Sequence, residues 1–349
     1  RLFDIDVIQT DGMKISRTDL GFSTRKCLIC NQEAFVCSCA RTHSVKELLE
    51  QECQIMTNYF AKQHARKLSS LSMQALLYEV SVTPKPGLVD RNNTGAHQDM
   101  DIFTFEASAV SLNHYFEQFA LCGIENGHEP FSRIFSRLRS LGIQAEENMF
   151  RATNQVNTHK GLIFSLAIMN GALGYMYANH IPYSPDTLLK INRKLVADVL
   201  EDFNDVTVEN ARTNGERLYA LYGMKGARGE ALSGYHTVLK KALPVLKHQL
   251  DRGLSLNDAG AVTLLYIMAH SEDTNIVNRS SYHSMKKIQS LLRETLNDPE
   301  FINKDPIPYI ESLDREFIKN NISPGGSADL LALTFFLYLF ENSGLSSIL

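Results

Sequence analysis

The sequence predicts an all-α protein: a multi-helix globular bundle preceded by a short N-terminal segment of strand and loop that is rich in cysteine. Three observations predict this fold. After residue 43, apolar residues recur at three- and four-residue spacing, as in Leu71 and Ala75, which is the period of a helix with one buried face. Strand-type alternation almost disappears from the same point. Four of the six cysteines lie within Cys27–Cys39, so the N-terminal segment differs in composition from the remainder of the chain.

The overall composition is that of an ordinary globular protein, with 44% hydrophobic and 21% charged residues among 349. A formal net charge of −4 provides no broad basic surface, which argues against nucleic acid or an anionic membrane as a partner. Any binding of phosphates must therefore be local. No Pro/Ser-rich linker divides the chain after Leu48, so we expect one all-helical domain over residues 44–349.

Residues 1–43 form the first, different segment. Leu2–Ile8 alternates apolar and polar residues as a half-buried strand does, and Gly12 suits the turn after it. Asp4 and Asp6 would share one face of that strand, where they could hold a metal. So short a segment cannot bury enough surface to fold alone without a metal or further sequence. Because the sequence opens on Arg1 with no signal or transit pattern, we expect it to begin within a longer polypeptide.

The cysteines of this segment are candidate zinc ligands. The Cys27-x2-Cys30 pair is followed by Cys37, Cys39 and His43, and thiolates with imidazole are a typical donor set of zinc. The alternative is a set of reduced structural cysteines. A disulfide framework spread over a secreted domain is absent, so we expect a location in the reducing cytoplasm.

Apolar periodicity and flanking turn residues predict the helices of the larger segment. The longest uncharged stretch, Gly161–Ala178, approaches the length that spans a bilayer, but Asn170 and Gly174 suit close packing, so we interpret it as a buried core helix. After the first helical pattern, which continues to about Val80, helices are expected over Asp101–Cys122, Pro130–Leu141, Gln144–Thr153, Gly161–Ala178, Pro185–Phe203, Ala227–Gln249, Asp258–His270, Ser281–Leu296, Pro308–Asn320 and Ser327–Glu341.

The loop Glu79–Asp101 is dense in side chains that bind metals and phosphates. Its two prolines exclude a regular helix. Hard cations prefer carboxylate oxygens, and phosphates prefer Lys or Arg, so the segment predicts a magnesium and phosphate site. In the alternative interpretation, Asp99 and Asp101 cap the following helix while Asp90 forms a turn.

The segment Gly142–Gly161 is the second candidate. Glu146 shares a helix side with Met149 and therefore faces partly inward. His159 and Lys160 fall in the first turn of the next helix, where a cation opposes the helix dipole unless an anion binds there. Lys160 and free backbone amides would then bind a phosphate. The alternative is a surface lysine beside a satisfied histidine.

Three further loops have the same character. Ala211–Ala231 combines glycines at 223, 226 and 229 with Arg228 but matches neither the P-loop nor the dinucleotide fingerprint. His270–Arg279 carries Asp273 and Arg279, which could belong to a ligand site or, as the alternative, form a buried structural ion pair. Ile322–Leu330 contains Gly325-Gly326-Ser327 directly before an apolar helix, which makes an anion-receptive helix start.

Together these five segments resemble the triphosphoribosyl-dephospho-coenzyme A synthases, which make the prosthetic-group precursor of citrate lyase and related carrier-protein enzymes. The resemblance covers about Ala65 to the C-terminus, and the Thr83–Asp90 and Ser323–Leu330 runs are specific. Residues 1–43 resemble the C-terminal end of the apo-citrate lyase phosphoribosyl-dephospho-coenzyme A transferase, in Arg1–Val7 and Cys39-Ala40-Arg41 among others. Some members of the two families are fused, so the chain resembles a fusion that lacks most of its first half.

The resemblance implies a reaction in which ATP and 3′-dephospho-coenzyme A give 2′-(5″-triphosphoribosyl)-3′-dephospho-coenzyme A and adenine. ATP is the ribosyl donor, Mg²⁺ accompanies it, and the partners are both nucleotides and, indirectly, the citrate lyase acyl carrier protein or its transferase. Two other interpretations remain: a magnesium-dependent nucleotide N-glycosidase or hydrolase, and a non-catalytic module that holds the coenzyme. The sequence leaves open whether the chain forms a homodimer.

These considerations give three sets of candidate site residues. The catalytic candidates are Asp90, His97, Asp99, Asp101, Glu146 and His159. The metal candidates are Asp99, Asp101 and Glu146 for Mg²⁺, and Cys27, Cys30, Cys37 and Cys39 for Zn²⁺. The candidates for binding substrate and phosphate are Lys85, Arg91, Asn157, Lys160, Arg228, Asp273, Asn275, Arg279, Gly325, Gly326, Ser327 and Asp329.

Overall fold

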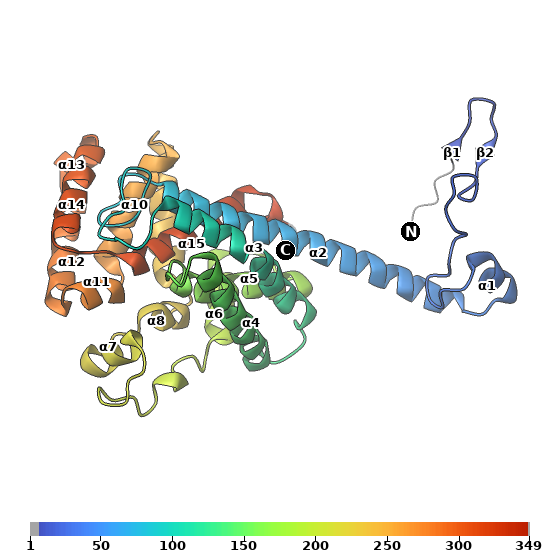
Figure 1. The fold of residues 1–349 in the computed structure, drawn as a ribbon, viewed down its shortest axis with the longest axis horizontal. Helices are drawn as coiled ribbons and strands as arrows, with labels where there is room; N and C mark the ends of the chain where they lie inside the picture. Colours follow the sequence, from blue (N-terminus) through green and yellow to red (C-terminus); the bar gives the residue numbers. More distant parts are fainter. Residues whose placement is uncertain (1–6, 348–349) are drawn as a thin grey trace. The chain divides into compact units, whose positions relative to one another are not determined.

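The structure is a computed structural model that describes residues 7–347, with the side chains of residues 202, 302 and 303 left aside. It confirms the all-α fold. Over the described residues the chain forms fifteen α-helices, three short η segments and one two-stranded ladder (Figure 1). In chain order the elements are β1 (Val7–Ile8), β2 (Lys14–Ile15), α1 (Ala34–Ala40), α2 (Val45–Ser81), α3 (Ile102–Glu125), α4 (Phe131–Ala152), α5 (Lys160–Ala178), α6 (Pro185–Leu195), η1 (Glu201–Phe203), α7 (Asn214–Tyr222), α8 (Gly226–Leu232), η2 (Val238–Ala242), α9 (Leu243–Asp251), α10 (Leu256–His270), α11 (Thr274–Arg279), α12 (Tyr282–Asn297), α13 (Pro299–Asn303), α14 (Ile307–Lys319), α15 (Gly325–Asn342) and η3 (Leu345–Ser347).

The chain divides into two compact units, residues 1–63 and residues 64–349. In the first unit β1 pairs antiparallel with β2, with Val7 opposite Ile15. Gly12 has a φ of +87° in the connecting turn, a conformation that glycine adopts without strain. Helix α1 and the first half of α2 complete this unit.

The core of the second unit is built from helices that are apolar on nearly every side. Helices α5, α10 and α15 bury most of their residues, and α3 packs along α5 and α4. Gly123 of α3 and Gly174 of α5 allow a close approach, because a Cβ on Gly174 would lie 2.2 Å from the backbone oxygen of Ala120. α5 is long and apolar enough to cross a membrane, but 72% of its apolar window is buried inside the protein. This agrees with its expected place in the core.

Several helix boundaries differ from those expected. The expected helix Pro185–Phe203 ends at Leu195 as α6, and turns and η1 follow it. Pro130–Leu141 and Gln144–Thr153 are one helix, α4, because an interior glycine costs only about 1 kcal/mol while α4 buries Leu138 and Met149 on either side of Gly142. The expected helix Ala227–Gln249 is instead interrupted after α8, where Gly234 has a φ of +75°.

Several segments expected as loops contain short helices, namely α7, α11 and α13. Helix α7 begins with a capping box in which Thr213 and Glu216 each accept a hydrogen bond from the other's backbone N–H. Of the strand expected over Leu2–Ile8, the described residues Val7 and Ile8 are extended. Asp4 and Asp6 lie outside the described residues.

Candidate active site

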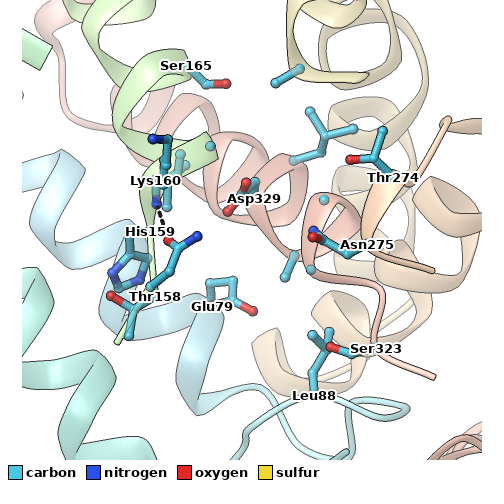
Figure 2. Close-up of a pocket in the computed structure, with 18 of the residues that line it drawn as sticks. Glu79, Leu88, Thr158, His159, Lys160, Ser165, Thr274, Asn275, Ser323 and Asp329 are labelled. Carbon is cyan, nitrogen blue, oxygen red and sulfur yellow. Dashed lines mark hydrogen bonds between the residues drawn. The ribbon is translucent and has the colours of Figure 1, made fainter. Parts of the chain in front are cut away.

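A cavity of about 360 Å³ lies where the N-termini of α5 and α15 meet the end of α2 and the loop that follows it. The loop before α11 and the start of α8 complete its wall. Figure 2 shows Glu79, His159, Lys160, Asn275 and Asp329 arranged around this space, contributed by helices that are far apart in the sequence. Two helix N-termini at one cavity offer unpaired backbone N–H groups and a favourable field for an anion.

The loop after α2 is held in a compact form by two carboxylates. Asp90 accepts hydrogen bonds from the backbone N–H of Lys85 (3.1 Å) and Asn92 (2.7 Å). Asp314 of α14 accepts from the backbone N–H of Gly87 at 2.9 Å. Asp90 is 3% exposed and is not part of the cavity wall. The structure therefore gives Asp90 the turn-forming position that the sequence left as an alternative.

Lys85 and Glu79 form a buried ion pair at the floor of the cavity, with side-chain exposures of 2% and 4%. Burial raises the pKa of Glu79, and the Lys85 ammonium opposes that rise. A buried charge is tolerated only when it is paired. The pair thus places a negative group and a positive group in the wall of one polar cavity.

Asp329, in the first turn of α15, has a carboxylate that reaches the cavity. Within residues 7–347 no hydrogen bond or ion pair satisfies it. Burial raises its pKa well above the usual range, and the neighbouring Glu79 and Asp273 raise it further. Gly161 makes room for it, because a Cβ at that position would lie 2.4 Å from Asp329 Oδ2. A carboxyl group with a raised pKa and no partner is suited to proton transfer or to pairing with a cation.

Asp273 has a structural position instead. It caps α11 by accepting from the backbone N–H of Asn275 at 2.9 Å, and it accepts from the backbone N–H and the hydroxyl of Ser327 at 2.7 and 2.8 Å. These bonds join α11 to the first turn of α15. Burial raises the pKa of Asp273, and the bonds from Ser327 oppose the rise. Asp273 and Ser327 are not in the cavity wall, whereas Asn275, Gly325 and Gly326 are.

Besides Lys85, two further cations from the predicted set line the cavity. Lys160 Nζ lies 2.9 Å from a Glu146 oxygen, and its side chain is 54% exposed. Arg279 donates to the backbone oxygen of Ala96 at 2.7 Å and faces His97 Nδ1 at 3.0 Å. Asn157 also lines the cavity and accepts from the backbone N–H of Lys160 at 3.2 Å.

Two histidines in the wall are neutral at neutral pH. Arginine cannot accept a hydrogen bond, so His97 Nδ1 accepts from Arg279, and His97 Nε2 donates to Ser323 Oγ at 2.8 Å. Burial and Arg279 lower the pKa of His97. Burial, followed by the charge of Lys85, lowers the pKa of His159 to about 3.

His159 also presents an unsatisfied nitrogen. Its Nδ1 lies 2.6 Å from Ser108 Oγ, which itself accepts from Thr158 at 2.8 Å. Ser108 is therefore free to donate to Nδ1, and we assign the ring proton to Nε2. That nitrogen is buried without a partner, and His159 lines the cavity. A buried donor of this kind is costly unless a ligand or water accepts from it.

The three carboxylates expected to hold magnesium are not brought together. Asp101 caps α3 by accepting from the backbone N–H of Thr104 at 2.9 Å. The Asp99 side chain is 63% exposed, 3.8 Å from His97. Glu146 pairs with Lys160. Among the described residues, the group with metal-ligand spacing is formed by Cys27, Cys30, Cys37 and His43.

The remaining two predicted basic residues lie away from this cavity. Arg91 donates to Asn257 Oδ1 at 2.9 Å. Arg228 lies over the ring of Phe203, 4.7 Å from its centroid, in the wall of a second cavity of about 450 Å³. Lys160 and Gly161 belong to the walls of both cavities. The second cavity is largely apolar and includes Phe164, with basic side chains at its rim.

Sequence reasoning missed several residues of the wall. They are Glu79, Thr158, Ser165, Glu230, Thr274 and Ser323. A signal existed for Glu79, because it follows Ala75 by four residues and Leu76 by three. A carboxylate at that spacing falls on the apolar face of the helix.

Comparisons with known proteins agree with this picture. The family model CitG, described as ATP:dephospho-CoA triphosphoribosyl transferase, matches residues 65–347. The chain belongs to this family. A second family model, CitX, described as apo-citrate lyase phosphoribosyl-dephospho-CoA transferase, matches residues 1–59. The chain thus joins parts of two families, as expected from the sequence.

The curated relatives match either nearly the whole chain or its larger part. Protein CitXG of Haemophilus influenzae is 36% identical over 98% of this chain and 74% of the relative. A probable 2-(5″-triphosphoribosyl)-3′-dephosphocoenzyme-A synthase of Vibrio cholerae is 40% identical over 78% of this chain and 88% of the relative. The 2-(5″-triphosphoribosyl)-3′-dephosphocoenzyme-A synthase of Haemophilus ducreyi is 38% identical over 88% of this chain and 98% of the relative. No solved structure matches the chain.

Proposed function

We propose that this chain transfers the triphosphoribosyl group of ATP to the 2′-hydroxyl of 3′-dephospho-coenzyme A and releases adenine. The observation that carries the proposal is a single polar cavity, within the CitG-family part of the chain, whose wall combines four acidic side chains, three cationic side chains and two helix N-termini. Transfer of a sugar between two polyphosphorylated nucleotides needs both kinds of group in one place.

The phosphate chain of ATP would bind along the cationic side. Lys160 at the N-terminus of α5 and Arg279 at the end of α11 supply charge. The backbone N–H groups of Gly325 and Gly326 at the N-terminus of α15 supply hydrogen bonds and the positive end of a helix dipole. Asn275 lines the cavity beside Gly325 and adds an amide donor.

The reacting sugar carbon would lie against the carboxylates. The C1′–N9 bond of ATP breaks with its electron pair leaving on adenine, and the acceptor 2′-oxygen forms the new bond to C1′. The positive charge that develops on the sugar is stabilised by nearby carboxylates. Over the whole reaction the proton of the acceptor hydroxyl is transferred to adenine, so the products balance the substrates.

Asp329 is our candidate for moving that proton, because it lines the cavity and burial raises its pKa, which favours the protonated form that can donate. Glu79, paired with Lys85, is the candidate for stabilising the charged sugar. His159, neutral and with Nε2 unsatisfied, is the candidate donor to a ring nitrogen of adenine or to a phosphate oxygen. The catalytic roles expected for Asp90 and Asp101 are not part of this proposal.

Magnesium would enter with ATP. Mg²⁺ keeps several waters and commonly uses only one or two protein carboxylates beside the phosphates. The cavity fits that requirement, since Glu272 lies in its wall and has no role in the proton transfer assigned to Asp329. The ion would neutralise phosphate charge there.

The acceptor would bind in the second cavity. Its apolar wall suits the pantetheine arm of dephospho-coenzyme A, and the basic residues at its rim, Arg228 among them, suit the diphosphate. Lys160 and Gly161, common to both walls, would then lie where the donor and the acceptor meet. On this proposal, Arg228→Ala raises the KM for dephospho-coenzyme A more than the KM for ATP.

The product would serve the citrate lyase acyl carrier protein. Residues 1–59 match the CitX model, whose description names a transferase that acts on apo-citrate lyase. Within this proposal, residues 1–43 are the end of a transferase-like domain, and residues 44–349 are the synthase.

We also place the chain in the bacterial cytoplasm, where its six unpaired cysteines stay reduced.

The deciding experiment incubates the purified chain with ATP, Mg²⁺ and 3′-dephospho-coenzyme A and identifies the products by chromatography and mass. We expect adenine only when dephospho-coenzyme A is present, together with a triphosphoribosyl adduct. Adenine released without the acceptor would indicate an N-glycosidase. ADP or AMP would indicate phosphoryl chemistry, and binding without turnover would indicate a coenzyme-holding module.

A further inference from the structure

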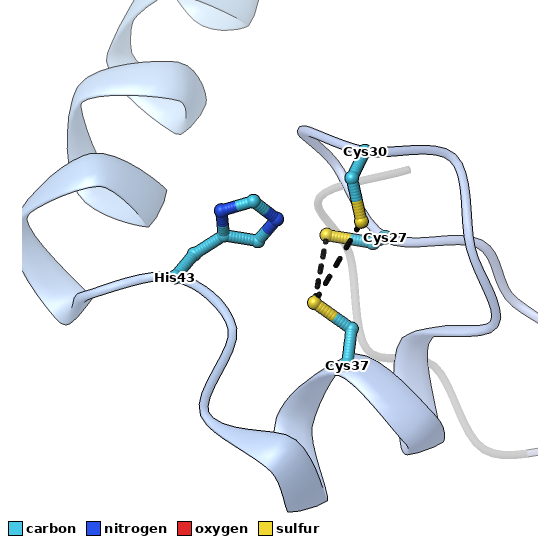
Figure 3. A group of neighbouring side chains, drawn as sticks. All are labelled: Cys27, Cys30, Cys37 and His43. Atoms are coloured by element: carbon cyan, nitrogen blue, oxygen red, sulfur yellow. Dashed lines mark hydrogen bonds between the residues drawn. The ribbon is translucent and has the colours of Figure 1, made fainter.

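Four side chains of the N-terminal unit meet around one point (Figure 3). The ligand atoms of Cys27, Cys30, Cys37 and His43 all lie within 4.8 Å of one another. Cys37 Sγ is 3.5 Å from Cys27 Sγ and 3.8 Å from Cys30 Sγ. In a tetrahedral zinc site with Zn–S bonds of about 2.3 Å, the sulfur atoms stand about 3.8 Å apart. The observed separations therefore approach those of an assembled zinc site.

The backbone explains why these four residues converge. The Cys27-x2-Cys30 turn closes through the Cys27 N–H, which donates to the Gln32 oxygen at 2.7 Å, and Asn31 adopts a φ of +63°. The backbone N–H of Ile29 points at Cys27 Sγ, 3.4 Å away. Such an N–H stabilises a sulfur that carries negative charge.

The other two residues of the cluster come from α1 and from the turn that follows it. Cys37 lies in the middle of this helix, which ends at Arg41 in the left-handed conformation with a φ of +48°. The chain then turns so that His43 lies opposite the three sulfur atoms (Figure 3). The spacing C-x2-C-x6-C-x5-H thus combines a loop pair with a pair at the end of a helix.

Two further observations indicate that this cluster binds an ion. The Nε2 atom of His43 is buried and has no hydrogen-bond partner in residues 7–347. Over residues 7–60, Cys27 and Cys37 are the buried side chains, while Phe22, Phe35 and other apolar side chains are exposed. A segment whose only buried residues are two cysteines has no hydrophobic core to hold it, so another interaction must do so.

We propose that Cys27, Cys30, Cys37 and His43 bind one Zn²⁺ ion in a closed, structural site that holds residues 25–43 in their fold. Binding displaces the three thiol protons to solvent and leaves four protein ligands and no open position, so the ion does no chemistry. The site differs from the set expected from cysteine spacing alone, because Cys39 is exposed and lies outside the cluster. His43 takes the fourth position.

The test is metal analysis of the full-length chain purified under reducing conditions. We expect about one zinc per chain, lost in Cys37→Ser and in His43→Ala. Cys39→Ser is the matched control, because it removes a thiol two residues from a ligand, and it should keep its zinc. Replacement of zinc by Co²⁺ should give the visible absorption of a tetrahedral thiolate site in the wild type and in Cys39→Ser.

Four results would overturn the proposal. Two concern the wild type: the absence of both bound zinc and a cobalt spectrum, or a Cys27–Cys37 disulfide in the chain as purified. The other two concern the variants: loss of zinc from Cys39→Ser equal to the loss from Cys37→Ser, or full retention of zinc in Cys37→Ser. A second measurement does not depend on the variants folding. Removing zinc from the wild type with a chelator should speed amide exchange over residues 25–43, and restoring zinc should reverse it; unchanged exchange would count against a structural ion.

Discussion

At the scale of single residues, the cavity at the N-termini of α5 and α15, where we propose that ATP binds and which we call the donor cavity, combines polar groups that have partners with polar groups that have none. Lys85 is neutralised by Glu79, and Asp273 is saturated by hydrogen bonds from two elements. The Nε2 of His159 is buried without a partner among the described residues, and the Asp329 carboxylate reaches the cavity without a hydrogen bond or ion pair there. A folded protein keeps such groups when a ligand supplies the missing interaction. This contrast separates the residues that build the cavity from those available to a substrate.

Asp329→Asn should lower kcat for adenine release by about 10²–10⁴-fold, the contribution typical of a positioned proton-transfer group. The substitution keeps the shape of the side chain but removes the transferable proton and the charge. The measurement is adenine formed per minute with saturating substrates. Asp251→Asn, an exposed residue at the end of α9, is the control and should be unaffected. Equal rates in Asp329→Asn and the wild type would remove Asp329 from the mechanism.

The same substitution should stabilise the ligand-free protein as the pH rises. Burial raises the pKa of Asp329 in the folded state, so the folded chain binds more protons than the unfolded chain above about pH 3.9. The stability contributed by this group therefore falls as pH increases through the folded-state pKa. Asn does not titrate, so the melting temperature of Asp329→Asn minus that of the wild type should grow from acid to neutral pH. A constant difference would contradict the assigned pKa shift.

At the scale of elements, the donor cavity depends on how closely α5 packs against α3, since α5 begins with Lys160 at the cavity wall. The two helices approach through Gly123 and Gly174, where any side chain would meet the backbone of the other helix. The contact involves backbone atoms, so no rotamer change relieves it. The position of the α5 N-terminus is thus determined partly by glycines far along the helix.

Gly174→Ala should destabilise the protein by about 1–3 kcal/mol, the usual cost of overpacking, because its Cβ would lie 2.2 Å from a backbone oxygen. Gly142→Ala in α4 is the matched comparison. Its Cβ would have nothing within 4 Å, so it should stabilise by about 0.4–1 kcal/mol by restricting the unfolded chain. Denaturant unfolding of both variants measures the difference. Similar effects from the two substitutions would show that the α3–α5 contact is less tight than described.

At the scale of the whole molecule, the donor cavity gathers segments from most of the CitG-family part of the chain. Ligand binding should therefore protect regions that are distant in sequence. In hydrogen-exchange mass spectrometry, ATP with Mg²⁺ should slow exchange around Lys85, Lys160, Arg279 and Gly325 together, and should leave residues 25–43 unchanged. Protection confined to one of the four segments would contradict a shared site.

The sequence predicted the long helices well because each buries a continuous apolar face. The prediction failed where local backbone geometry determines the end of a helix. The break after α8 depends on positive φ at Gly234 and Tyr235, and a tyrosine gives no signal for such a conformation. α4 was divided at Gly142 because a glycine looks like a boundary, although burial on both sides outweighs its cost.

The candidate site was predicted only in part, because the role of a loop side chain depends on its neighbours in the folded chain. Lys160, Asn275, Arg279, Gly325 and Asp329 do line one cavity. Whether a loop carboxylate binds a ligand or caps a helix is decided by its neighbours in space, and the same residue types serve both purposes. Asp90 and Asp101 are examples, since both accept hydrogen bonds from nearby backbone N–H groups. Glu79 was missed because it lies within a regular helix.

The unpaired carboxylate of Asp329 also distinguishes this cavity for inhibitor design. P-loop nucleotide sites surround phosphates with backbone amides and a lysine and do not offer a free acid beside the ribose. A sugar analogue with a protonated ring nitrogen would pair with Asp329 and imitate the charge that the ribose acquires during transfer. A hydrogen-bond acceptor on the same compound, placed to accept from His159 Nε2, would satisfy that nitrogen, which has no partner among the described residues. Such a compound would discriminate against P-loop ATP sites by charge as well as by shape.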